Sequence, residues 1–143
     1  MKKAFTMIEI LISIAIISVL TAVGIVSYVS INTNARDAKR RGDIEQIRSA
    51  LEFYRSDNGY YPAIGPDTFV DASGLLSVTD MTNYIAAIPS DPKGSTQPYK
   101  YKATNGSGTP AKYYGYCLSA LIEGTGSTSC TAYTGYNYGV KNP

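Results

Sequence analysis

The chain of 143 residues contains no histidine and no tryptophan, and it has only two cysteines, Cys117 and Cys130. Without histidine, the commonest general base and the commonest metal ligand are missing. No serine or cysteine has an identifiable base partner, and we find neither a glycine-rich phosphate loop nor a metal-ligand spacing. We therefore predict that the protein is not an enzyme, and we expect no cofactor and no metal site.

An excess of charge of one sign is also missing. There are 13 lysines and arginines against 11 acids, and without Lys2 and Lys3 the two signs balance. A near-neutral chain offers no electrostatic case for nucleic acid as an obligate partner. The acids of the second half are scattered through predicted turns, and we interpret them as caps and turn residues: Asp57, Asp67, Asp71, Asp80 and Asp91.

Charge is absent altogether from Ile10 to Ile31, a run of 22 residues. A helix of this length spans about 33 Å, which is enough to cross a hydrocarbon core of roughly 30 Å. The apolar stretch of a secretory signal peptide is shorter, about 7–15 residues, and ends in a small-residue cleavage site. No A-x-A pattern closes this run, so we expect the segment to be retained as a membrane helix.

The composition gives two conflicting indications of how this segment is oriented in the membrane. Two lysines precede it, whereas Arg36, Lys39, Arg40 and Arg41 follow it, and this count places the C-terminal side in the cytoplasm. The cysteine pair, and a C-terminal part of the chain rich in serine, threonine and tyrosine, instead favour a C-terminal side outside the cytoplasm.

No proline occurs before Pro62, and the helical pattern continues past the apolar run. Ile44, Ile47, Leu51 and Tyr54 recur at spacings of three, four and three, which indicates an amphipathic helix. The Asn58-Gly59 pair is a typical helix stop. The pattern predicts one helix from about residue 5 to about residue 57, roughly 80 Å long.

Two glycines, Gly24 and Gly42, interrupt this predicted helix. In an exposed helix interior each costs about 1 kcal/mol relative to alanine. Close packing between neighbouring helices explains them, and so does a point where the helix bends or melts locally. Both interpretations remain open at this level.

The head, residues 58–143, is predicted to carry a small antiparallel sheet. We expect a loop at 60–78 and a short helix at 79–88, with Thr79 or Asp80 as its N-cap. Strands are expected at 99–103, 112–122 and 136–140. We interpret Asn105-Gly106 as the hairpin turn between the first two, rather than as part of a glycosylation acceptor. The predicted fold is α+β, a long N-terminal helix packed against this sheet.

A head of this size is marginally stable without a covalent link. Cys117 and Cys130 close a loop of 14 residues, and a disulfide there contributes about 3 kcal/mol on the chain-entropy model. Two buried free thiols in a reducing compartment are the alternative. Eight of the 13 tyrosines lie between Tyr99 and Tyr138, and we interpret them as core or subunit contacts rather than as an adhesive face.

The N-terminal residues follow a recognisable pattern. A short basic leader, a small residue and then FTMIEILISIAIISVL resemble the type IV pilin and pseudopilin family. DIEQIRSALEFYRSDNGYYP, IPSDP and YKY are similar to later parts of that family. The resemblance implies that a prepilin peptidase cuts between Ala4 and Phe5 and that the new N-terminal Phe5 is methylated. Ala4 departs from the glycine usual at this position.

The resemblance divides the chain into a leader (1–4), a transmembrane and filament-core helix (5–31), the amphipathic half of the same helix (32–57) and the globular head (58–143). Cleavage at the cytoplasmic face implies that the head lies outside.

The resemblance also implies a role in assembly for Glu9. A carboxylate beside an apolar medium is costly unless it is paired. Cleavage creates a positive amine on Phe5, four residues before Glu9, so the pair can form within one chain or with the preceding subunit. The simpler alternative is a glutamate favoured at a helix N-terminus by about 0.3–1 kcal/mol.

In this family the subunits leave the cytoplasmic membrane through an inner-membrane assembly platform and form a homo-oligomeric helical filament. We predict a type IV pilus pilin, extracellular on the cell surface, and leave adhesion, motility and DNA uptake open as roles of its filament. The alternatives are a pseudopilin of a type II secretion-like system and a signal-anchored surface protein that never assembles. The major pseudopilin typically binds calcium through an acidic C-terminal loop, and here that region holds one acid, Glu123.

Overall fold

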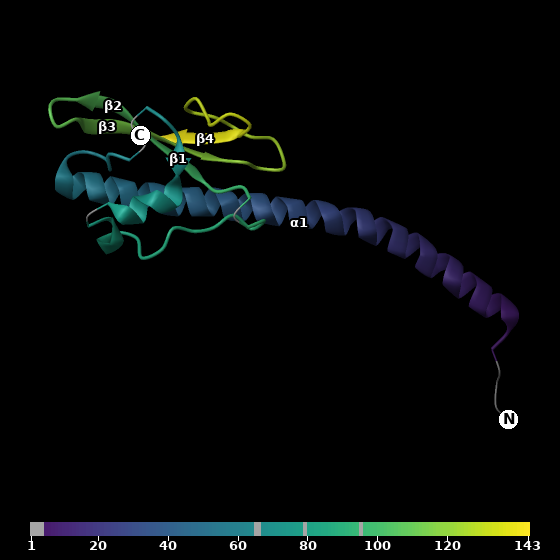
Figure 1. Ribbon diagram of the computed structural model, residues 1–143. Helices are drawn as coiled ribbons and strands as arrows, with labels where there is room; N and C mark the ends of the chain where they lie inside the picture. Colours follow the sequence, from purple (N-terminus) through teal and green to yellow (C-terminus); the bar gives the residue numbers. More distant parts are fainter. Residues whose placement is uncertain (1–4, 65–66, 79, 95) are drawn as a thin grey trace. The chain divides into compact units, whose positions relative to one another are not determined.

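The computed structural model describes residues 5–64, 67–78, 80–94 and 96–143, and its fold is α+β, as predicted (Figure 1). The chain divides into two compact units, Met1–Ala35 and Arg36–Pro143. Its elements, in order, are helix α1 (Met7–Asn58), strand β1 (Val70–Asp71), the 3-10 helices η1 (Ala72–Ser77) and η2 (Met81–Asn83), and strands β2 (Lys100–Ser107), β3 (Lys112–Ala120) and β4 (Tyr138–Lys141).

Helix α1 begins two residues later than predicted because Thr6 acts as its N-cap. The Thr6 hydroxyl accepts a hydrogen bond from the Glu9 N–H at 3.3 Å. At the other end, Gly59 has a φ of 80° and its N–H donates to the Arg55 carbonyl at 2.7 Å. Glycine adopts this left-handed conformation without a Cβ penalty, so the predicted stop is confirmed.

The sheet has four antiparallel strands in the order β1-β2-β3-β4, one strand more than the sequence predicted. The additional strand, β1, is only two residues long and pairs Val70 with Tyr101. Part of the predicted loop at 60–78 is therefore ordered as β1 and η1. A strand of two residues has no measurable alternation, which explains why the periodicity did not reveal it.

Two further predictions about the head are wrong. Instead of a helix over 79–88 there is the single turn η2, and Asp80 precedes it at a φ of 67° with no side-chain cap bond; Thr79 lies outside the described residues. Asn105-Gly106 is not the hairpin turn, because β2 continues to Ser107 and the connection follows it. Asn105 has a φ of 58° inside the strand, a conformation that asparagine tolerates better than most residues.

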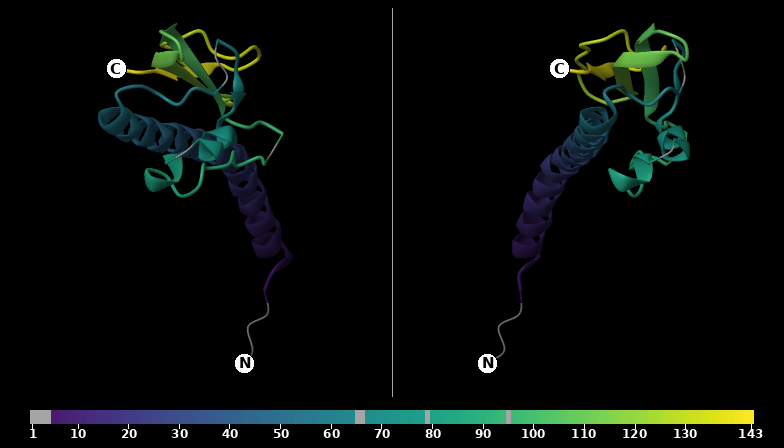
Figure 2. Two further views of the ribbon diagram at one scale, coloured as in Figure 1. Left: turned by 60° about the vertical axis from the view of Figure 1, so that its left-hand side comes forward. Right: turned by 90° about the vertical axis from the view of Figure 1, so that its left-hand side faces the viewer.

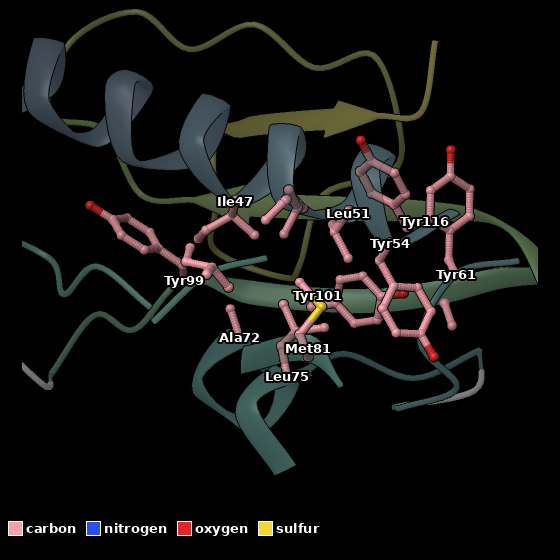
Figure 3. Packing of buried hydrophobic residues seen from close by; sticks show 14 of the residues in the cluster. Ile47, Leu51, Tyr54, Tyr61, Ala72, Leu75, Met81, Tyr99, Tyr101 and Tyr116 are labelled. Atoms are coloured by element: carbon pink, nitrogen blue, oxygen red, sulfur yellow. The ribbon is translucent and has the colours of Figure 1, made fainter. Parts of the chain in front are cut away.

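The core lies between the C-terminal half of α1, the sheet and the two 3-10 helices (Figures 2 and 3). The predicted apolar stripe of α1 is buried in it: Ile44, Ile47, Leu51 and Tyr54. Leu75 and Met81 close the side opposite the helix (Figure 3). The second half of the helix thus packs on its own head, as expected.

Tyrosines fill much of this core, which confirms the structural interpretation for that part of the tyrosine set. Tyr61 and Tyr116 meet edge to face with ring centroids 4.7 Å apart, and Tyr101 stacks on Tyr116. Each hydroxyl has an acceptor: Tyr101 donates to the Pro62 carbonyl, and Tyr61 and Tyr116 donate to Glu52. A buried phenol needs such a partner, so the aromatic core also restricts which polar groups surround it.

Candidate functional site: the N-terminal helix and the C-terminal loop

Glu9 and Thr6 form a reciprocal cap at the start of α1. The Glu9 carboxylate accepts hydrogen bonds from the backbone N–H and from the hydroxyl of Thr6, both at 2.8 Å. In return the Thr6 hydroxyl accepts from the Glu9 N–H. This T-x-x-E arrangement is a capping box. The pair predicted for Glu9 requires the amine that cleavage would create on Phe5, and in the uncleaved chain the partner of Glu9 is Thr6.

The helix that follows exposes its apolar side chains on every side. Every large apolar side chain described between Phe5 and Ile31 is more than half exposed. The helix is long and apolar enough to cross a membrane. Burying apolar surface gains roughly 25 cal/mol per Å², so covering this segment with lipid or with other helices is favourable.

Of the other predicted N-terminal sites, Ala4 lies outside the described residues, and Phe5 is 82% exposed. Gly24 and Gly42 both lie inside α1, and a Cβ added at either position meets no atom within 4 Å. Neither glycine is therefore required by a contact within the described part of this chain.

The C-terminal loop, defined here as residues 121–137, is tied to the sheet by a disulfide between Cys117 of β3 and Cys130. This is the predicted pairing. Around it, the Asn137 side chain donates to the Ile122 carbonyl and accepts from the Ile122 N–H, each at 2.8 Å. The loop is thus fastened to β3 by one covalent bond and closed on itself by a side-chain amide.

A second attachment of this loop is ionic, and the sequence analysis missed it. The Arg40 guanidinium is fully buried and donates to Asp91 through Nε at 2.6 Å and Nη2 at 3.1 Å. Its Nη1 donates to Asp37 at 2.8 Å and to Glu123 at 3.0 Å. Asp91 is the turn residue we predicted, because its carboxylate accepts from the Lys93 N–H at 2.7 Å and its carbonyl accepts from the Gly94 N–H at 2.8 Å. It is also a buried ion-pair partner, which we did not predict.

Two more cations reach the same cluster from its solvent side. Arg36 donates to both oxygens of Glu123, at 2.7 and 2.8 Å, and the Lys93 ammonium lies 3.0 Å from Glu123. The Arg36 guanidinium, followed by the Lys93 ammonium, holds the pKa of Glu123 well below its usual range. The carboxylate of Asp91, followed by those of Glu123 and Asp37, raises the pKa of Arg40 despite its burial.

One feature of the sequence could have indicated this cluster. Arg40 lies four residues before Ile44, so it extends the apolar stripe by one turn. A charged residue on the buried stripe needs a carboxylate partner. The identity of that partner is decided by tertiary contacts, because Asp91 is 51 residues away in the chain.

The carboxylates of the C-terminal loop and its neighbours do not suit a calcium ion. Calcium takes six to eight oxygen ligands. All six carboxylate oxygens of Asp37, Asp91 and Glu123 already accept at least one bond from an arginine, a lysine or a backbone N–H. Within the described residues, no group of three or more histidine, cysteine, aspartate or glutamate side chains is placed to hold a metal ion.

These features define a class of protein: a subunit with an exposed apolar N-terminal helix and a small, internally fastened head. Two family models match the chain, the prokaryotic N-terminal methylation motif over residues 1–25 and type II secretion system protein G over residues 27–116. The chain belongs to the protein G family, and thus to the pilin and pseudopilin group that the N-terminal pattern indicated.

Two curated relatives carry the same designation, type II secretion system core protein G. The one from Pseudomonas aeruginosa is 30% identical over 83% of this chain and 84% of its own length. The one from Escherichia coli is 31% identical over 66% of this chain and 68% of its own length. No solved structure matches the chain significantly.

Proposed function

We propose that the chain is a structural subunit of a type II secretion pseudopilus, of the protein G type. The observation that carries the proposal is the family match over residues 27–116, directly behind a methylation motif. It replaces the type IV pilus as the preferred function and leaves the shared assembly route in place. The role is structural and requires no catalytic group.

In this proposal the precursor is anchored in the cytoplasmic membrane by α1, with the head outside. A prepilin peptidase cuts between Ala4 and Phe5, and Phe5 is methylated. Subunits then associate into a filament through the exposed apolar side chains of the N-terminal unit. Removing those side chains from lipid costs little only if neighbouring helices take the place of the lipid.

Glu9 acts in this assembly after cleavage. The capping box already satisfies its carboxylate in the intact chain, through Thr6. Cleavage removes the peptide bond before Phe5 and leaves a charged amine one turn from Glu9. The same carboxylate then serves as acceptor for a cation, in its own chain or in a neighbouring one.

Deletion of the gene in its source bacterium separates the two filament types. If the chain is a pseudopilus subunit, the deletion strain should fail to release secreted enzymes into the medium but should keep its surface filaments. Complementation with an Ala4→Leu variant, which a small-residue peptidase site excludes, should fail to restore secretion and should accumulate as a longer precursor. Normal secretion in the deletion strain, together with loss of sheared surface filaments, would contradict the pseudopilus.

Normal secretion with loss of sheared surface filaments would support a type IV pilus pilin. One observation favours this candidate, namely the C-terminal loop, which is closed by a disulfide and whose carboxylates do not suit calcium. In that case the mature chain, with a methylated Phe5, would be abundant in the sheared surface fraction. Intact mass and N-terminal peptide mass measure both properties in one sample.

A further inference from the structure

The C-terminal loop and the segment 88–94 are both attached to α1 through the side chain of Arg40. Its guanidinium donates to Asp91 of that segment, to Glu123 of the loop and to Asp37 of α1. Arginine presents its donors in a rigid planar fork, which allows one side chain to satisfy several carboxylates at once. Arg40 is the group that these three parts of the chain have in common.

The charges of this cluster cancel. Three cations, Arg36, Arg40 and Lys93, face three carboxylates, Asp37, Asp91 and Glu123. A divalent cation added to a neutral cluster would bring two uncompensated charges into a site whose central groups are fully buried. It would also have to displace donors from oxygens that are already occupied, so the arrangement disfavours metal binding.

The cluster also orders the backbone of the loop. The backbone N–H groups of Glu123 and Gly124 donate to the two oxygens of Asp37, at 2.9 and 2.8 Å. Arg40 in turn holds Asp37 in place from the next turn of the helix, at 2.8 Å. The position of the loop backbone therefore depends on Arg40 through Asp37.

We propose that Arg40 is an internal counter-ion that fastens the C-terminal loop and the segment 88–94 to α1, so that the ordering of the loop requires no metal ion. The proposal concerns the head alone and holds for either type of filament. Arg40 is a positioning residue, because it acts on the loop through Asp37 and Glu123. The disulfide at Cys130 and the ionic cluster at Glu123 then fasten the same loop at two separate points.

The test uses the full chain in detergent micelles and hydrogen exchange resolved at the amides of Glu123 and Gly124. In the Arg40→Met variant these amides should exchange on the order of 100-fold faster, because a buried pair has lost one partner. The matched control is Lys39→Met, which removes the same charge from an exposed neighbouring position and should leave both rates unchanged. Equal rates in the two variants would overturn the proposal.

Because Arg40→Met leaves buried carboxylates unpaired, a second variant covers the case in which it does not fold. Glu123→Gln keeps the Arg40–Asp91 and Arg40–Asp37 pairs and weakens only the attachment of the loop. It should speed exchange at Glu123 and Gly124 while the amides of β2 and β3 stay protected. Unchanged exchange at these two amides would count against the role of the cluster.

The requirement for a metal is measured on the unaltered chain. Its melting temperature and the exchange rates at Glu123 and Gly124 should be the same in millimolar calcium chloride and in excess EGTA. A lower melting temperature or faster loop exchange in EGTA would overturn metal independence. The measurement separates this proposal from the filament assignment, because neither readout depends on assembly or secretion.

Discussion

The phenol of Tyr99 donates a 2.7 Å hydrogen bond to the carboxylate of Asp43, and both side chains are buried. The two residues are 56 positions apart, one on α1 and the other just before β2. Burial and then the Asp43 carboxylate raise the pKa of Tyr99, so the phenol remains a donor at any physiological pH. The bond links α1 to the start of β2 within the head.

Replacing Tyr99 by phenylalanine should therefore destabilise the head by about 1–3 kcal/mol, because the Asp43 carboxylate loses its donor in a buried site. Thermal unfolding of the purified chain measures the loss. The matched control is Tyr114→Phe, which removes the same hydroxyl from a side chain that is 44% exposed. Equal melting temperatures for the two variants would show that the Tyr99 hydroxyl contributes nothing specific.

The Cys117–Cys130 disulfide should stabilise the head by about 3 kcal/mol on the chain-entropy model. Cys130→Ser should lower the melting temperature accordingly, and a reductant should lower that of the unaltered chain but not that of the variant. Calorimetry with and without dithiothreitol tests both statements. Equal melting temperatures for the variant and the unaltered chain would mean that the C-terminal loop is held in place without the disulfide.

Stability should decline in acid through Glu123 and Asp37. Arg36 and Lys93 lower the pKa of Glu123 from 4.5. Burial raises the pKa of Asp37, but the N–H groups of Glu123 and Gly124 outweigh it and the net shift is downward from 3.8. Both pKa values are depressed in the folded state, so the stabilisation is complete above the unfolded values and is lost as the pH falls toward the folded ones.

Melting temperatures measured from neutral pH downward test this expectation. Glu123→Gln should have a lower melting temperature at neutral pH and a flatter decline in acid than the unaltered chain. Glu45→Gln is the control, because Glu45 is 52% exposed and pairs only with Arg48 among the described residues. Parallel acid curves for Glu123→Gln and the unaltered chain would rule out Glu123 as a source of the pH dependence.

The two roles of Glu9 can be separated by substitution. Glutamine completes a capping box as well as glutamate does, but it carries no charge. If assembly requires the charge, Glu9→Gln should lose filaments as completely as Glu9→Ala, while Thr6→Ala should lose the cap and keep filaments. Filament assembly, measured by chemical crosslinking of subunits in whole cells, is the readout, with head melting temperature as the control. Normal filaments from Glu9→Gln would restrict Glu9 to capping.

Gly42→Ala should raise the stability of the head by about 1 kcal/mol, which is the difference in helix propensity. The added methyl group has open space around it in the isolated subunit. If neighbouring subunits approach closely at Gly42, the same variant should assemble poorly although it melts at a higher temperature. Unfolding and filament yield measured on one preparation distinguish the two effects, and a lower melting temperature would contradict the propensity argument.

The sequence by itself determined the features that depend on local patterns. Helix α1 is predicted by signals that each lie within a short stretch of sequence. They are the uncharged run from Ile10 to Ile31, the apolar stripe at Ile44, Ile47, Leu51 and Tyr54, and the stop at Asn58-Gly59. With only two cysteines, the pairing of the disulfide had one solution. The N-terminal pattern also indicated the family.

Tertiary structure alone decided which distant groups meet. Strand β1 exists only because Val70 pairs with Tyr101, and a two-residue segment carries no pattern of its own. Asp91 lies in the turn that its local sequence predicted, but it is also a buried partner of Arg40 because the chain returns to α1 after 51 residues. A charge in a low-dielectric interior needs an oppositely charged or hydrogen-bonding partner close to it in space. Sequence periodicity does not report contacts between residues so far apart in the chain.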